Sequence, residues 1–176
     1  VTILVATSGD TGGAVANSFL GVKGIEVLIL YPKGKVSKVQ EQQLTTLGQN
    51  ITAFEVDGVF DDCQDMVKTA FLDQDVTNKR QLTSANSINV ARWLPQMFYY
   101  FIAYRTLKRL NKPLVVSVPC GNFGNICAGI MAREIGLPID HFVASTNIND
   151  VVPDYLKTGK YSLKKSTPTL SNAMDV

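Results

Sequence analysis

Residues 114–129 read LVVSVPCGNFGNICAG, and this stretch decides how the rest of the chain is interpreted. The apolar run Leu114–Val118 predicts a buried strand that ends at Pro119. A glycine loop follows, and the small-residue run 126–132 predicts a helix. A strand, a glycine turn and a helix start together point free backbone N–H groups at an anion. The sequence therefore predicts a phosphate held by main-chain amides in this loop.

The composition of the loop favours the same interpretation. It has no charged side chain, so the amides and the helix end have to hold the anion. We expect its two glycines, Gly121 and Gly124, to adopt positive φ and to let a ligand approach the backbone. An ordinary strand–turn–helix connection with an asparagine cap is the alternative. The spacing G-x-x-G matches neither the dinucleotide fingerprint GxGxxG nor the phosphate loop GxxxxGK[ST].

Composition narrows the function classes. The 176 residues form one large domain or two small ones. With 17 basic and 15 acidic residues, the net charge of +2 gives no basic footprint for nucleic acid. Three cysteines without a CxxC pair and the single His141 argue against a metal site and favour a reducing compartment, so we predict a cytoplasmic location. Charged residues and Pro95 interrupt the apolar stretches, so we expect no membrane span.

Strands and helices alternate along the chain, which predicts open, mostly parallel α/β sheets with flanking helices. The long apolar helix expected at 90–110, with Pro95 in its first turn or at a kink, could connect two sheets. We therefore expect two lobes, residues 1–90 and 91–176. The predicted strands are 1–6, 25–31, 51–56, 81–84, 114–118 and 141–145.

Five polar or glycine-rich groups each follow a predicted strand. In an open parallel sheet, ligands bind at the carboxyl ends of the strands, so these groups are expected at the binding edge. The groups are TSGDTGG (7–13), PKGK (32–35), SANSIN (84–89), PCGNFGN (119–125) and STNIND (145–150).

The first of these groups offers hydroxyls and amides at a second helix start. We expect Ser8 and Thr11 to bind the carboxylate of a small substrate, with Asp10 close to the polar edge of a cofactor. The alternative is that Thr7 and Asp10 form a capping box.

A second anion site is predicted from cationic and neutral donors. Lys35, Asn86, Ser87 and Arg92 supply an ammonium, two neutral donors and a guanidinium, which suits a phosphate. A solvated lysine and a surface ion pair are the alternatives. Two phosphate-type sites near a carboxylate site suggest a phosphorylated cofactor beside a phosphorylated amino acid.

Over essentially the whole chain, the motifs TSGDTGG, YPKGKVS, SANSINVARW, VPCGNFGN, STNIND and TLSNAMDV resemble the threonine synthases, pyridoxal-phosphate enzymes of fold type II. The resemblance implies conversion of O-phosphohomoserine and water to threonine and phosphate. It also implies that the cofactor phosphate is bound by Gly121, Asn122, Phe123, Gly124 and Asn125, and the pyridine hydroxyl approached by Asp10. The substrate carboxylate would bind Ser8 and Thr11, and the substrate phosphate would bind Lys35, Asn86, Ser87 and Arg92.

One departure from the family concerns activity. The family holds its cofactor on a lysine in a Phe-Lys-Asp context, and no lysine of this sequence has that context. We expect an internal fragment of a longer enzyme, because the chain begins without Met inside a predicted strand. We therefore name no catalytic residue and expect this polypeptide alone to be inactive.

Two other functions stay open, as does the oligomeric state, monomer or homodimer. A serine or threonine dehydratase would share the fold but would need no site for a substrate phosphate. A non-catalytic relative that binds a phosphorylated ligand would lack the lysine for a different reason. The consumption of phosphohomoserine, as opposed to threonine, distinguishes the first alternative.

Overall fold

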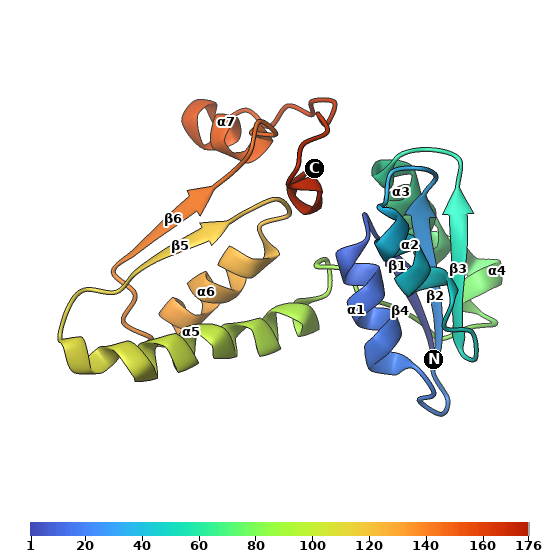
Figure 1. Cartoon of the computed structure of the whole chain (residues 1–176), viewed down its shortest axis with the longest axis horizontal. Coiled ribbons are helices and arrows are strands. Elements are labelled where there is room, and N and C mark those ends of the chain that lie inside the picture. Colours follow the sequence, from blue (N-terminus) through green and yellow to red (C-terminus); the bar gives the residue numbers. More distant parts are fainter. Residues whose placement is uncertain (176) are drawn as a thin grey trace. The chain divides into compact units, whose positions relative to one another are not determined.

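The computed structural model describes residues 1–175, which divide into two compact units, Val1–Asn89 and a second that begins at Val90. The predicted lobe boundary lies one residue further along the chain. The predicted alternation of strands and helices is confirmed in both units (Figure 1). Within residues 1–175, no helix has the length and apolar character needed to cross a membrane.

The first unit is built on a four-stranded, all-parallel sheet in the order β3-β2-β1-β4. Short apolar runs form its inner strands because both faces are covered by helices. Its elements are β1 (Thr2–Ala6), α1 (Asp10–Phe19), β2 (Glu26–Pro32), α2 (Lys38–Thr45), β3 (Ile51–Val56), α3 (Phe60–Leu72), α4 (Gln74–Thr77) and β4 (Leu82–Ser84).

Alternate residues of the inner strands enter two different cores. Val5 and Ile29 pack with Leu44 of α2 in one core, on the face that α1 and α2 cover. Leu4 and Leu30 pack with Cys63 of α3 in the other core. This two-residue period fixes the register, because a shift of one residue would exchange the two sets of side chains.

The second unit has a two-stranded parallel sheet, β5 (Val115–Pro119) and β6 (His141–Ser145). The helical region predicted at 90–110 consists of three parts: a 3₁₀ turn η1 (Val90–Arg92), α5 (Trp93–Leu107) and a 3₁₀ turn η2 (Lys108–Leu110). Pro95 lies in the first turn of α5, where its missing N–H costs no helical hydrogen bond. The remaining elements are α6 (Gly124–Glu134), α7 (Val151–Thr158) and a 3₁₀ turn η3 (Asn172–Met174).

A close helix crossing holds the second unit together. A Cβ added to Gly129 of α6 would lie 2.6 Å from the ring of Tyr100 on α5 and 2.7 Å from the ring of Phe142 on β6. Met97, Ala128 and Ala132 complete this core with Leu137 and Ile139. The packing positions the start of α6, and with it the glycine loop, against the end of β5.

Candidate functional site

In the first unit, three of the five predicted polar groups follow β1, β2 and β4. Because these strands are parallel, the groups lie at one edge of the sheet. The other two groups follow β5 and β6 and share the corresponding edge of the second sheet. The prediction that all five follow the carboxyl ends of strands is confirmed within each unit.

The loop between β1 and α1 is held from inside by Thr7. Its side-chain hydroxyl accepts hydrogen bonds from the amides of Gly9 and Gly12, both at 2.9 Å. Thr7 is only 1% exposed, so this hydroxyl satisfies two donors that water does not reach. The Thr7 amide donates to the carbonyl of Leu30 at 2.9 Å, which ties the loop to β2.

The predicted alternative of a capping box between Thr7 and Asp10 is wrong. The N-cap of α1 is Gly9, with φ of 135°, and the Asp10 carboxylate accepts a hydrogen bond from Gln40 Nε2 at 2.8 Å. A Cβ on Gly9 would lie 2.4 Å from the Gln40 side chain, so the loop and α2 are in close contact. The capping box lies on α2 itself, where Ser37 and Gln40 exchange hydrogen bonds.

Ser8, Asp10 and Thr11 stand on the open side of this loop. Ser8 and Thr11 are half-buried, and Asp10 is exposed. Their residue types and position allow them to bind a small polar ligand, with two hydroxyls as neutral donors and one carboxylate held by Gln40.

Asn86 links the loop after β4 to the end of β1. Its side-chain oxygen accepts from the Ala6 amide at 2.9 Å, and its side-chain nitrogen donates to the Ala6 carbonyl at 2.6 Å. Both ends of the Asn86 amide therefore have backbone partners. Ser87, the next residue, is half-buried and brings a hydroxyl to the same loop.

The predicted cations lie on different units. Lys35 is exposed in the loop after β2, while neighbouring Lys33 forms an ion pair with Glu55 at 3.6 Å. Arg92 ends η1 in the second unit, is half-buried, and its carbonyl accepts from Gln96 Nε2 at 2.8 Å. Their common role as a phosphate site stays a prediction.

The glycine loop, Gly121–Asn125, adopts a different conformation from the one expected. Its left-handed residue is Phe123, with φ of 59°, and neither Gly121 nor Gly124 has positive φ. The expectation that these two glycines adopt positive φ is therefore wrong. Gly121 is needed for space, because a Cβ there would lie 2.7 Å from Met174 Cα.

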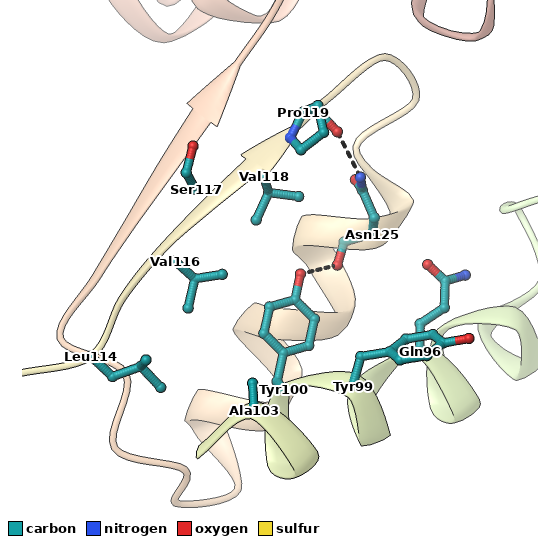
Figure 2. A pocket seen from close by; sticks show the side chains of 10 residues that line it. All are labelled: Gln96, Tyr99, Tyr100, Ala103, Leu114, Val116, Ser117, Val118, Pro119 and Asn125. Carbon is teal, nitrogen blue, oxygen red and sulfur yellow. Dashed lines mark hydrogen bonds between the residues drawn. The ribbon is translucent and has the colours of Figure 1, made fainter. Parts of the chain in front are cut away.

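Asn125 closes the loop between β5 and α6. Figure 2 shows its side-chain nitrogen donating to the Pro119 carbonyl at 2.7 Å and its own carbonyl accepting from the Tyr100 hydroxyl at 2.7 Å. Its side-chain oxygen accepts from the adjacent Ile126 amide at 2.9 Å, within the first turn of α6. Side-chain hydrogen bonds therefore fix the loop on its β5 side.

A hollow of about 300 Å³ lies beside these residues, between α5 and β5 (Figure 2). It is lined mainly by apolar and aromatic side chains such as Tyr99, Tyr100 and Val116, and none of its lining residues is charged. Its chemistry does not suit an anion, in contrast to the loop above it.

The donor set of the glycine loop fits a phosphate. Within residues 1–175, the backbone N–H groups of Gly121 to Asn125 make no hydrogen bond to another protein group. The first turn of α6 has no acidic side chain. Successive amides next to a left-handed residue at a helix N-terminus form a concave group of donors for an anion.

The cysteine beside the glycine loop adds no negative charge that would repel an anion. Burial raises the pKa of the Cys120 thiol, and the nearby Cys127 raises it further. Cys120 is therefore a neutral thiol at neutral pH and adds no negative charge beside the loop. The described part of the chain contains no group of side chains that could hold a metal ion, and all three cysteines are free thiols.

Several residues of this edge were not singled out from the sequence. Thr7 acts through the backbone amides of Gly9 and Gly12, and Gln40 acts through Asp10, thirty residues away in the sequence. In the second unit, Asp175 accepts hydrogen bonds from Asn147 and Thr169. The only available signal was the density of Asn, Ser and Thr in STNIND and TLSNAMDV. Val176, the last residue of that motif, lies outside the described residues.

Comparison with known proteins identifies the family. A model of the family "Pyridoxal-phosphate dependent enzyme" matches residues 1–176. The chain is 53% identical, over 177 aligned residues, to the threonine synthase of Buchnera aphidicola subsp. Acyrthosiphon pisum. The alignment covers 100% of this chain and 41% of that protein.

Two solved structures agree with this match. The crystal structure of threonine synthase from Escherichia coli superposes with a TM-score of 0.94 at 50% identity, covering 100% of this chain and 41% of that one. Threonine synthase from Brucella melitensis, solved with pyridoxal phosphate bound, gives a TM-score of 0.84 at 41% identity, covering 99% of this chain and 38% of that one. This chain thus spans about 41% of the length of the first curated relative it matches. The chain belongs to the pyridoxal-phosphate dependent enzyme family.

Proposed function

We propose that the protein containing this chain is a pyridoxal-phosphate-dependent threonine synthase, which converts O-phosphohomoserine and water to threonine and phosphate. The observation that carries the proposal is the match of the whole chain to threonine synthases, at 53% identity to the Buchnera protein. The uncharged amide loop after β5 supports it, because that loop suits the phosphate of the cofactor.

The glycine loop is the proposed site of the cofactor phosphate. The amides of Gly121 to Asn125 would donate to its oxygens, while Asn125 and Tyr100 keep the loop closed from below. When bound, pyridoxal phosphate supplies an electron sink for reactions at the carbons of an amino acid. Asp10, held by Gln40, is proposed to lie near the ring hydroxyl of the cofactor.

Substrate binding is assigned to the neutral donors and cations of the same loops. Ser8 and Thr11 are proposed to donate to the substrate carboxylate from the open side of the first loop. Lys35, Asn86, Ser87 and Arg92 are proposed for the substrate phosphate. For Asn86 the hydrogen bonds to Ala6 favour a supporting part, in which it holds its loop against β1 and leaves Ser87 as the direct donor.

Two further proposals concern the cellular location of the protein and the activity of this chain alone. The three free thiols support the predicted cytoplasmic location. No lysine of this sequence lies in the Phe-Lys-Asp context of the family. We therefore propose that the 176-residue chain expressed alone does not form threonine, and that the full-length protein does.

The test is a product assay on the full-length protein with pyridoxal phosphate. We expect threonine and inorganic phosphate to appear in equal amounts from O-phosphohomoserine. Consumption of threonine or serine with release of an oxo acid, and no reaction with phosphohomoserine, would identify a dehydratase. Binding of phosphohomoserine without turnover would identify a non-catalytic relative.

A further inference from the structure

The carboxylate of Asp175 is surrounded by neutral hydrogen-bond donors. Its Oδ1 accepts from Asn147 Nδ2 at 2.7 Å and from the Thr169 hydroxyl at 2.7 Å. Its Oδ2 accepts from the Thr169 amide at 2.7 Å. Asn149 Nδ2 adds a further contact to Oδ1 at 3.1 Å. We call Asn147, Asn149, Thr169 and Asp175 the clasp.

The clasp joins two segments that are far apart in the sequence. Asn147 and Asn149 belong to the loop after β6, and Thr169 and Asp175 flank the turn η3. Asn149 also exchanges hydrogen bonds with the backbone of Thr167, whose amide donates at 2.7 Å and whose carbonyl accepts at 3.0 Å. Residues 167–175 are thereby fixed to the end of the second sheet.

The turn that the clasp holds lies directly on the glycine loop. Within the turn, the Met174 amide donates to the Ser171 carbonyl at 2.8 Å. A Cβ on Gly121 would lie 2.7 Å from Met174 Cα and 3.2 Å from the Ala173 carbonyl oxygen. The backbone of the turn therefore occupies the space that any larger residue at position 121 would need.

The loop is thus supported on two sides by different devices. Asn125 fixes it against the end of β5, and the Cys120 amide donates to the Ser145 carbonyl of β6 at 2.7 Å. The turn η3 covers Gly121 from the other side. Amides that bind an anion have to be fixed beforehand, because a mobile loop would lose entropy on binding.

We propose that the clasp positions the cofactor-phosphate loop: it seats η3 against Gly121 and keeps the loop amides directed at the phosphate. The inference rests on the proposed function, since it assigns STNIND and TLSNAMDV a supporting part at the same site. Asp175 is a positioning residue and does not contact the cofactor. A carboxylate is required because both of its oxygens accept, whereas an asparagine would replace one acceptor with a donor.

The test uses Asp175→Asn in the full-length protein, with Asp140→Asn as the matched control. Asp140 is exposed and directly precedes β6, so it undergoes the same chemical change at the opposite end of the strand from the clasp. We expect Asp175→Asn to weaken the binding of pyridoxal phosphate about tenfold and to leave the affinity for pyridoxal, which lacks the phosphate, within about twofold. Exchange of the Cys120 amide, which is bonded to the Ser145 carbonyl next to the loop, should become faster in the cofactor-free protein. Asp140→Asn should change none of these.

A second pair of variants keeps the test decisive if Asp175→Asn does not fold. Thr169→Val removes one hydroxyl of the clasp and should lower the preference for pyridoxal phosphate over pyridoxal, whereas Thr169→Ser should restore it. Equal affinity changes for both ligands, or unchanged exchange of the Cys120 amide, would overturn the positioning role. If the unaltered protein itself shows no preference for pyridoxal phosphate, the proposed function fails instead.

Discussion

The loops after β1 and β5 share one local plan, a strand followed by a glycine-containing turn and a helix start, yet their backbone amides are used differently. The strands themselves differ, because β1 is buried throughout whereas only Val118 of β5 is buried, so the predicted buried strand at 114–118 is wrong. In the first loop, the Thr7 hydroxyl accepts hydrogen bonds from the amides of Gly9 and Gly12, and Asp10 lies in the first turn of α1. In the second loop, within residues 1–175, no protein group accepts a hydrogen bond from the amides of 121–125, and the first turn of α6 has no acidic residue.

This difference separates two kinds of binding. In the first loop the amides of Gly9 and Gly12 are satisfied internally, and the side chains of Ser8, Asp10 and Thr11 offer mixed donors and acceptors to a ligand. A loop whose amides are unused suits an anion. The glycines also differ in purpose, since Gly9 adopts φ of 135° while Gly121 makes room for η3.

The largest effect is expected when the internal hydroxyl of the first loop is removed. Thr7→Val keeps the shape of the side chain but leaves two buried amides without an acceptor. We expect the free energy of unfolding of the full-length protein to fall by about 3 kcal/mol, measured by urea denaturation. Thr7→Ser, which keeps the hydroxyl, should lose clearly less. Equal losses in the two variants would show that the hydroxyl does not hold the loop.

An intermediate effect is expected when the second loop is given the charge of the first. Asn125→Asp places a carboxylate beside the unused amides and removes the donor to the Pro119 carbonyl, so we expect pyridoxal phosphate to bind at least about tenfold more weakly and pyridoxal to be little affected. The reciprocal change Asp10→Asn should affect both ligands alike, because both contain the ring hydroxyl. Titration by absorbance of the bound cofactor measures all four affinities. If Asn125→Asp weakened both ligands equally, the phosphate would not be at this loop.

The smallest effect concerns the contact between the first loop and α2. Gln40→Ala removes the hydrogen bond to Asp10 and the capping box with Ser37, both at exposed positions. We expect the free energy of unfolding to fall by less than about 1 kcal/mol. Gln42→Ala, at an exposed position of the same helix, should change the free energy of unfolding by no more than about 0.3 kcal/mol. A loss above about 2 kcal/mol for Gln40→Ala would mean that the loop depends on α2 as well as on Thr7.

Much of the fold could be predicted because the relevant signals are local. Apolar runs marked the strands other than the short β4, and the polar groups after them marked the binding edge. The assignment of Thr7 and Asp10 to a capping box failed, because Gln40, thirty residues away, offers Asp10 a better-placed donor. The clasp could not be predicted, since Asn147 and Asp175 are 28 residues apart and meet only when β6 and η3 are in place.

The sequence by itself determined the alternation of parallel strands and helices, the uncharged character of Gly121–Asn125 and the set of loops at the carboxyl ends of the strands. These features follow from side-chain periodicity and residue chemistry, which are local. Only the tertiary structure decided that Thr7 satisfies two amides, that Phe123 supplies the left-handed turn and that Gly121 lies under η3. Gly121 and Met174 are far apart in the chain and meet only in the folded unit. The short-range bonds of Thr7 also depend on the fold, because the Thr7 amide is tied to Leu30 of β2 and a hydrogen-bond partner is chosen by position in space.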